Sequence, residues 1–169
     1  MKNLFVATFF LLTLTTTAVN AQINSQKATV SFLFVSEDVQ GSISDLKTDI
    51  KIDDNMIANS YMKGSVAVTT LKTGNFLRDG HLMWKKYFYK KVFPRIAFES
   101  TTISKENEQL KVAGILTIKD ISKSVTIIFD KKDDILSGKM RINTYDYGIK
   151  ISKKKEENIV DVFFDFPLE

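Results

Sequence analysis

Apolar residues recur at every second position along most of this chain, in short runs that polar clusters separate. Between Leu46 and Ile52, for example, apolar or threonine side chains alternate with Lys47, Asp49 and Lys51. A period of two is typical of β-strands that bury one face and expose the other. The same alternation recurs in further runs, which are residues 30–34, 110–118, 125–129 and 160–166. We therefore predict a protein built mainly of half-buried β-strands.

The polar clusters between these runs are short and rich in residues that form turns. They are residues 53–55, 105–108, 131–134 and 153–158. Connections of this length suit antiparallel hairpins, because parallel strands need a crossover of a dozen or more residues. The spacing accommodates about eight to nine strands, and about eight are enough to enclose one small ligand. The pattern therefore predicts an all-β, antiparallel β-barrel of about eight strands, with a two-layer sandwich as the structural alternative.

One segment, residues 75–92, departs from the period of two. Trp84, Phe88 and Val92 recur there at intervals of four residues, which is the spacing of one face of an α-helix. Pro94 ends the pattern, because the residue before a proline is pushed out of helical geometry. We therefore expect a short, amphipathic helical insert between two of the strands.

The N-terminal segment, residues 1–21, has the organisation of a secretory signal peptide. A positive start at Lys2 precedes an apolar run over residues 4–14, and small residues lead up to Ala21. The apolar run is shorter than the roughly 20 residues that a transmembrane helix needs. We therefore expect cleavage after Ala21, a periplasmic or secreted mature protein, and one domain over residues 22–169.

The composition excludes several classes of function. The chain has no cysteine, which removes disulfides, thiol catalysis and cysteine-based metal sites. Its formal net charge of +4 is mild, and the lysines at 153–155 are followed directly by two glutamates. Nucleic-acid binding requires a concentrated basic face, so we expect no nucleic-acid partner. A peripheral contact with an anionic membrane surface is compatible with this charge.

The cluster around His81 invites a catalytic interpretation. His81 is the only histidine, and a solitary histidine does not supply the clustered ligands of a zinc site. Asp79 and either Ser100 or Ser122 complete a triad by composition only, because no Gly-x-Ser-x-Gly motif is present. We interpret Arg78, Asp79 and His81 as a hydrogen-bonded anchor of the insert. We predict no catalytic residue, no metal and no cofactor.

Aromatic residues are stronger candidates for a functional role than the cluster around His81, because they can bind an apolar ligand. In a small barrel, inward-facing rings either fill the interior or line a tunnel, and the sequence pattern alone favours the filled interior. In a tunnel, each buried CH₂ group of an apolar ligand contributes about 0.8 kcal/mol. The inward-facing candidates are Phe32, Phe34, Phe76, Trp84, Phe88, Phe98, Phe129 and Phe164.

Two lysine pairs at 85–86 and 90–91 alternate with tyrosines in the insert. Such a segment either rests on anionic lipid headgroups or forms a solvated face whose lysines extend into water. We favour the solvated face.

Several motifs occur together in one order along the chain. They are VAVTTLKT at 66–73 leading to RDGHL at 78–82, FPRIAFES at 93–100, GILTI at 114–118 followed by SKSV at 122–125, and a weaker YDYGI at 145–149. This ordered set resembles the YceI-like family, a lipocalin-like group of secreted bacterial barrels that bind isoprenoid lipids. The resemblance extends over nearly the whole expected mature chain.

The resemblance implies a lipocalin-like β-barrel that binds without catalysis. The implied ligand is a long apolar chain, a polyisoprenoid or an isoprenoid quinone, held in the barrel lumen by the aromatic residues. The insert at residues 75–94 is expected to shape or gate the mouth. An alternative from another functional class is a filled barrel that binds a protein partner through its outer surface or its open edge.

Overall fold

The computed structural model describes residues 23–168. The expected signal peptide, residues 1–21, and its cleavage site after Ala21 lie outside the described residues. Within residues 23–168, no helix has the length and apolar character that a membrane span requires.

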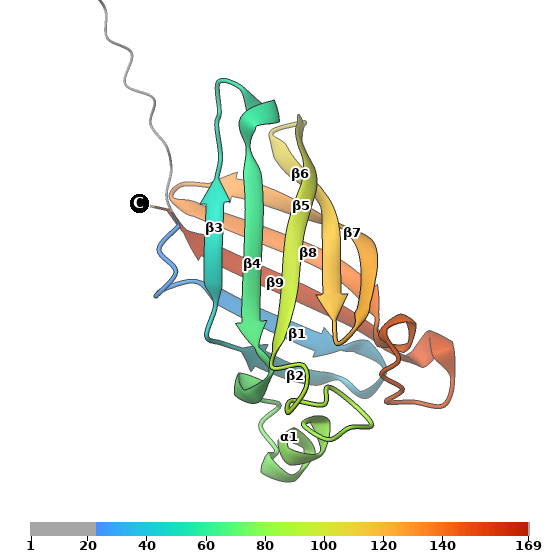
Figure 1. Ribbon diagram of the computed structural model, residues 1–169. Coiled ribbons are helices and arrows are strands. Elements are labelled where there is room, and N and C mark those ends of the chain that lie inside the picture. Colours follow the sequence, from blue (N-terminus) through green and yellow to red (C-terminus); the bar gives the residue numbers. More distant parts are fainter. Residues whose placement is uncertain (1–22, 169) are drawn as a thin grey trace, which may run out of the picture.

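Within this range, nine strands form a single sheet with the order β2-β1-β9-β8-β7-β6-β5-β4-β3 (Figure 1). The strands are β1 (Thr29–Phe34), β2 (Val39–Ile43), β3 (Lys47–Lys51), β4 (Tyr61–Ala67), β5 (Arg95–Glu106), β6 (Gln109–Ile118), β7 (Ile121–Lys132), β8 (Ile135–Asn143) and β9 (Ile159–Pro167). The helical elements are α1 (Phe76–Leu82) and the 3₁₀ helices η1 (Val35–Glu37), η2 (Ile57–Asn59), η3 (Val68–Thr70), η4 (Thr144–Tyr147) and η5 (Lys155–Glu157). Every strand pairing is antiparallel, which confirms the predicted all-β fold class.

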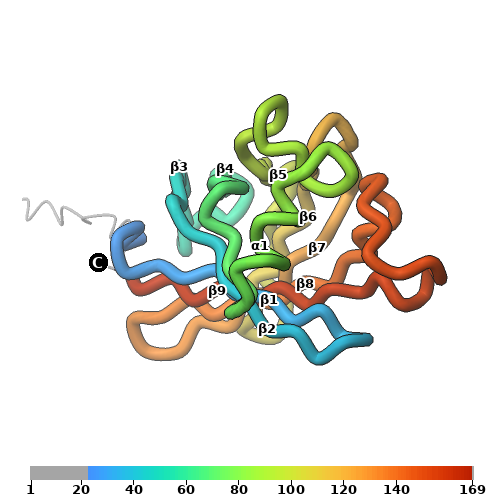
Figure 2. Tube along the Cα trace, turned by 90° about the horizontal axis from the view of Figure 1, so that it is seen from below, coloured from blue at the N-terminus to red at the C-terminus, as the bar shows by residue number. Residues whose placement is uncertain are grey.

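The sheet curls on itself into a half-barrel, so that β3, β4 and β5 face β1, β8 and β9 across the interior (Figure 1, Figure 2). Its two edge strands, β2 and β3, follow each other in the chain through residues 44–46. Lys72 closes part of the seam between them, since its backbone exchanges two hydrogen bonds of 2.9 Å with Ser42 of β2. One continuous, curled sheet corresponds to the predicted barrel and not to a two-layer sandwich.

The alternation in the sequence determines which side chains lie inside. In β6, Leu110 and Val112 are buried, while Lys111 between them is exposed. Strand β5 carries a β-bulge between Ser100 and Thr102. A bulge bends and twists a strand, and here it strengthens the curl that brings β5 over the interior.

One end of the half-barrel is closed by packed side chains. Val112 and Phe129 have no exposed surface, and Leu136 is 1% exposed. The rings of Phe164 and Phe166 each lie 5.9 Å from the ring of Phe129. These residues form the closed end, and α1 lies across the opposite end (Figure 1, Figure 2).

The helical insert is shorter than predicted. Asn75 caps α1, because its side-chain oxygen accepts hydrogen bonds of 3.1 Å from the backbone N–H groups of Leu77 and Arg78. The helix ends at Leu82, and the chain then turns so sharply that the Phe88 N–H donates to the Leu82 carbonyl oxygen. The prediction of a helix reaching residue 92 is therefore wrong. Burial of Phe88 outweighs helical continuation, since short helices gain most of their stability from tertiary packing.

Candidate ligand-binding cavity

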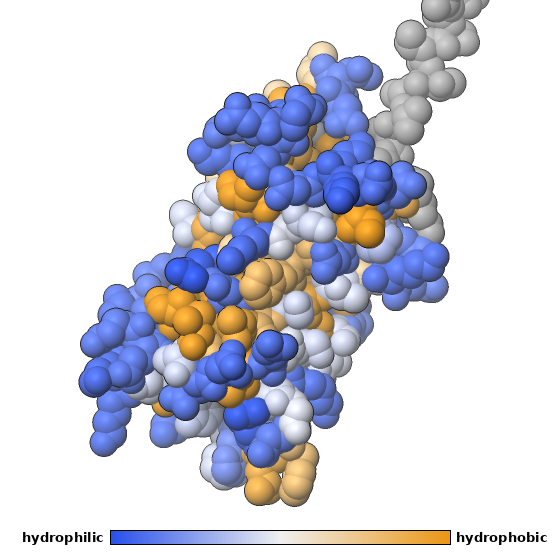
Figure 3. Space-filling model, turned by 180° about the vertical axis from the view of Figure 1, so that it is seen from behind, coloured by the Kyte–Doolittle hydropathy of each residue, from blue (hydrophilic) through white to orange (hydrophobic). Residues whose placement is uncertain are grey.

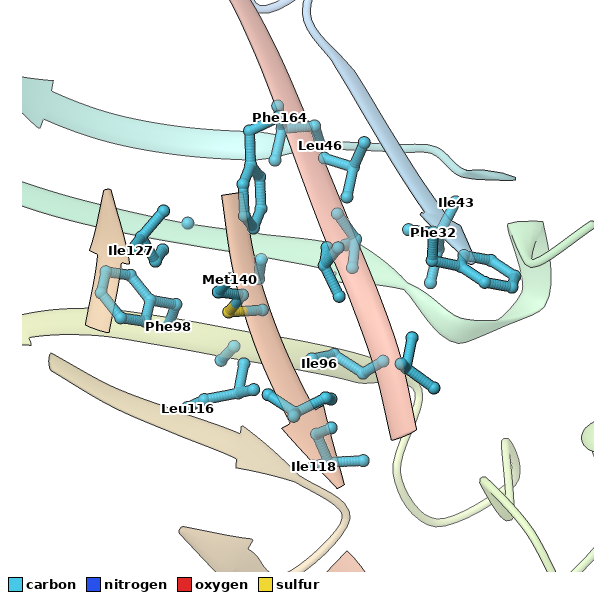
Figure 4. Close-up of a pocket in the computed structure, with 18 of the residues that line it drawn as sticks. Phe32, Ile43, Leu46, Ile96, Phe98, Leu116, Ile118, Ile127, Met140 and Phe164 are labelled. Atoms are coloured by element: carbon cyan, nitrogen blue, oxygen red, sulfur yellow. The ribbon is translucent and has the colours of Figure 1, made fainter. Parts of the chain in front are cut away.

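An apolar cavity of about 170 Å³ lies inside the half-barrel (Figure 4). Each of the nine strands in residues 23–168 contributes to its lining, and so does α1 through Leu82. The lining contains no charged side chain, and its hydroxyl groups are confined to Thr48, Ser65 and Thr144. We call the end of the cavity beside α1 the mouth, and its lining residues are Ile43, Leu71, Leu82, Phe88, Ile118, Thr144 and Ile151.

Several rings that line the cavity are only half-buried. Phe32, Phe98 and Phe164 keep accessible surface, whereas Phe129 at the closed end has none. Protein interiors are normally packed as densely as organic crystals, so inward-facing rings with accessible surface border unfilled space. Figure 4 shows Phe32, Phe98 and Phe164 around the space, with Met140 and Leu116 on its wall. The interior is therefore hollow between the closed end and the mouth.

Three of the lining rings pack directly on glycines of the neighbouring strand. The pairs are Phe32 with Gly41, Phe98 with Gly114 and Phe129 with Gly138. A Cβ atom placed on Gly138 would collide with the Phe129 ring, so any larger residue there pushes the ring toward the lumen. The glycines allow the rings to lie against the wall, and they thereby set the width of the cavity.

Six of the eight aromatic residues predicted to lie inward do line the cavity. They are Phe32, Phe34, Phe88, Phe98, Phe129 and Phe164. Phe76 and Trp84 do not, because their side chains are 81% and 60% exposed, and the prediction for these two is wrong. For Phe76 the physical reason is the orientation of α1, which buries Asp79 and Leu82 and turns its other face to solvent, whereas Trp84 follows the helix in the turn that brings Phe88 inward. That the six lining rings contact a ligand stays a prediction.

Sequence reasoning missed part of the lining. Leu82, Ile96 and Ile151 come from α1, the start of β5 and the connection between β8 and β9. None of the three belongs to a recognised alternating run, so the period of two offered no signal for them. Leu116 and Val160, by contrast, share the phase of alternating strands, and that phase is the signal that locates them.

A hydrogen-bond network around Thr73 holds α1 at the mouth. Asp79 Oδ1 accepts from the Thr73 backbone N–H at 2.8 Å and from its hydroxyl at 2.6 Å. Arg78 donates from Nε to the Thr73 hydroxyl oxygen at 2.7 Å and from Nη2 to the Thr73 carbonyl oxygen at 2.8 Å. The adjacent Lys72 pairs with β2, so this network fixes the start of α1 to the sheet edge. His81 lies outside the network, so the prediction that it forms part of the hydrogen-bonded anchor is wrong, and its ring is tilted by 56° against that of Trp84 at a centroid distance of 4.5 Å.

Asn158 organises the other side of the mouth, and sequence reasoning treated it only as part of a turn. It is fully buried, and its side-chain oxygen accepts from the backbone N–H groups of Ile151 and Ser152 at 2.8 and 3.0 Å. Its amide nitrogen donates to the carbonyl oxygens of Ser152 and Lys154 at 3.0 and 2.6 Å. One side chain therefore holds the loop that brings Ile151 to the cavity.

Tyr147 of η4 is buried beside this loop. Its hydroxyl group has no hydrogen-bond partner among the described residues. Burial raises the pKa of the Tyr147 phenol to about 12, and the negative charge of Asp146 adds to the effect. The hydroxyl is thus a polar group that the fold buries without compensation.

The charged groups of β8 and β9 lie on the outside of the barrel. Asp161 accepts hydrogen bonds of 2.6 and 2.8 Å from Nε and Nη2 of Arg141, and Lys139 lies 3.7 Å away. These bonds from Arg141 lower the pKa of the Asp161 carboxyl group. In residues 23–168, no group of three histidine, aspartate or glutamate side chains is placed to hold a metal ion.

A curled antiparallel sheet around an apolar lumen defines a lipocalin-like barrel, the class of fold that holds small ligands in its interior. The sequence model of the YceI-like domain matches residues 21–167, and the chain belongs to this family. The resemblance found in the sequence motifs is thereby confirmed.

Relatives and solved structures agree with this assignment. The chain is 26% identical over 129 residues to a UPF0312 protein of Photorhabdus laumondii, covering 69% of this chain and 67% of that one. It is 24% identical over 132 residues to protein YceI of Escherichia coli O157:H7, covering 72% and 69%. Burkholderia cenocepacia BcnA shares the fold with a TM-score of 0.73 at 20% identity, over 87% and 98% of the two chains. A polyisoprenoid binding domain from Saccharophagus degradans does so with a TM-score of 0.62 at 11% identity, over 90% and 99%.

Proposed function

We propose that this protein binds a long apolar ligand, a polyisoprenoid or an isoprenoid quinone, in the lumen of its half-barrel and performs no catalysis on it. The observation that carries the proposal is a cavity of about 170 Å³ whose lining has no charged side chain and only three hydroxyl groups. The family and the polyisoprenoid binding domain with the same fold support it.

The chemistry of the lining favours a hydrocarbon segment. An apolar cavity of roughly 150 Å³ in an engineered protein stays dry and takes up benzene, so a cavity of this size and lining suits an apolar group. Each CH₂ group that enters contributes about 0.8 kcal/mol. A polar headgroup inside would lose water without gaining a partner, at a cost of roughly 2–7 kcal/mol. The ligand's headgroup therefore stays at the mouth, beside Thr144 and Ile151.

The unfilled interior weighs against the alternative of a filled barrel that acts only as an interaction module. Such a module would bury Phe32, Phe98 and Phe164 completely among other side chains, and all three keep accessible surface. We also propose that the mature protein acts in the periplasm or outside the cell. The signal-peptide pattern ending at Ala21 supports this location.

Extraction of the native protein tests the proposal directly. The protein is purified without denaturation, extracted with organic solvent and analysed by mass spectrometry, and uptake of added polyprenols and quinones is measured. We expect a near-stoichiometric isoprenoid in the extract or saturable uptake. Repeated absence of both would refute lipid binding and favour the interaction module.

A variant that fills the lumen shows whether uptake occurs inside the barrel. Gly64 lines the cavity, and the nearest atom to a Cβ placed there is the Lys47 carbonyl oxygen at 3.7 Å, so Gly64→Leu adds bulk without a backbone clash. We expect Gly64→Leu to abolish uptake. The control is Gly80→Leu, since Gly80 lies on the exposed face of α1 with open space around it. Equal uptake by both variants would place the ligand elsewhere.

A further inference from the structure

The outer face of α1 exposes large apolar side chains at the mouth of the cavity. Phe76 is 81% exposed, Leu77 is 59% exposed, and Trp84 just beyond the helix is 60% exposed. In Figure 3, apolar atoms form a cluster at the lower tip of the molecule, where α1 lies in Figure 1. The segment that buries Leu82 and Phe88 thus leaves four further large apolar residues in solvent, because Val92 is exposed as well.

The same segment is strongly basic. Residues 72–92 contain six lysines and arginines and a single acidic residue, Asp79, which is buried against Thr73. The lysines at 85, 86, 90 and 91 are exposed, and none of them forms an ion pair with a carboxylate of residues 23–168. Lys63 and Lys111 on the barrel are paired with glutamates, while Lys47 and Lys123 are unpaired as well within the described range. This segment differs because its single acidic residue is buried, so no exposed carboxylate lies among its lysines. Within the described part of the chain, the positive charge of these four lysines therefore has no carboxylate partner.

Exposed aromatic and aliphatic side chains next to unpaired lysines are the features of segments that lie in the interface of an anionic membrane. Apolar side chains enter the headgroup region there, and lysines contact the lipid phosphates. Lys85 and Lys86 each lie beside a tyrosine ring, at 6.0 Å from Tyr89 and 5.4 Å from Tyr87. Charge and apolar surface thus occur together on one short segment.

We propose that the tip formed by residues 76–92 docks on the surface of an anionic lipid bilayer. The segment has two faces: Leu82 and Phe88 line the cavity, while Phe76, Leu77 and Trp84 point to the membrane. Docking would place the mouth against the bilayer. This role of the tip rests on the proposed function of lipid binding in the lumen. An apolar ligand then passes between membrane and lumen without crossing bulk water.

Trp84 provides the readout, because it is the only tryptophan of the chain. The protein is mixed with vesicles of phosphatidylcholine, with or without phosphatidylglycerol, that contain no isoprenoid. We expect the Trp84 emission to shift to shorter wavelength and the protein to float with the anionic vesicles only. High salt should reverse the binding, since part of the attraction is electrostatic.

Two variants with matched controls locate the contact. Lys85→Gln with Lys86→Gln should weaken vesicle binding about tenfold or more, because each lysine near an anionic surface contributes roughly 1 kcal/mol. The control removes the same charge through Lys132→Gln in the β7–β8 hairpin with Lys27→Gln before β1, two exposed lysines that also form no ion pair with residues 23–168, and it should leave binding unchanged. Leu77→Ser should also weaken binding, whereas Ile135→Ser at the same hairpin, 44% exposed in the native protein, should not.

The outcomes separate this proposal from lipid binding in the lumen. If the protein does not bind anionic vesicles but takes up a polyprenol supplied from ethanol, docking is refuted and the proposed function stands. Vesicle binding without any uptake supports docking and refutes the function. An equal loss of vesicle binding in the control variants would overturn the assignment of this tip. So would a Trp84 emission that is already shifted in a soluble oligomer without vesicles.

Discussion

At the closed end of the half-barrel, neighbouring strands contribute Val112, Phe129 and Leu136 to one buried hydrophobic cluster. At the mouth, irregular segments are held instead by single polar side chains, by Asp79 on one side and Asn158 on the other. The closed end provides stability through burial of apolar surface. In the proposed function the mouth is where the ligand enters, and its shape depends on a few hydrogen bonds.

The largest effect on stability is expected at the closed end. Phe129→Ala removes a fully buried ring and should lower the free energy of unfolding by about 3–5 kcal/mol. Phe88→Ala, at the mouth, should cost less, because Phe88 keeps 9% of its surface exposed and comes from an irregular segment that can adjust around the lost ring. Chemical denaturation of both variants measures the difference. A larger loss for Phe88→Ala would mean that the mouth, and not the closed end, stabilises the fold.

Asn158 is expected to be the most important polar residue of the mouth. Asn158→Ala removes four hydrogen bonds and leaves buried backbone groups of the loop without partners, which should cost about 2–3 kcal/mol. The loop that carries Ile151 should loosen, so ligand binding weakens as well. The control is Asn59→Ala in an exposed turn, with an expected change within about 0.5 kcal/mol. Similar unfolding midpoints for the two variants would show that the loop does not depend on Asn158.

Glycine substitutions should have opposite effects at the two ends. Gly138→Ala forces the Phe129 ring toward the lumen, so it should destabilise the protein by about 1–3 kcal/mol and reduce ligand uptake. Gly80→Ala lies in α1 with open space around its Cβ, and it should stabilise the protein by about 0.5–1 kcal/mol. Thermal unfolding and uptake measured on both variants test this contrast. Unchanged uptake in Gly138→Ala would show that the glycines do not set the cavity width.

The same division between the two ends explains what the sequence could predict. Strand residues such as Leu116 and Phe129 lie where the alternation places them, because the pleat of a strand directs every second side chain inward. The positions of Trp84 and Phe88 do not follow from their spacing, because the chain leaves the helix at Leu82 to bury one ring and expose the other. The role of Asn158 depends on partners that only the folded loop brings together. The local sequence pattern thus predicts the barrel, whereas tertiary contacts determine the structure of the mouth.

Tyr147 gives the smallest expected effect and a pH signature of its own. Its buried hydroxyl has no partner among the described residues, so Tyr147→Phe should raise the free energy of unfolding by about 1 kcal/mol.

The folded-state pKa of the Tyr147 phenol is about 12, whereas an exposed tyrosine ionises near 10, so both the folded and the unfolded state are protonated below pH 10. Above that pH the unfolded state loses its proton first, and stability declines up to about pH 12. Tyr147→Phe should remove this part of the alkaline decline, and Tyr61→Phe, whose exposed hydroxyl donates to Asp49, should bring no gain in stability. An unchanged alkaline decline in Tyr147→Phe would mean that the phenol is solvated, and that the mouth is more open to water than its packing indicates.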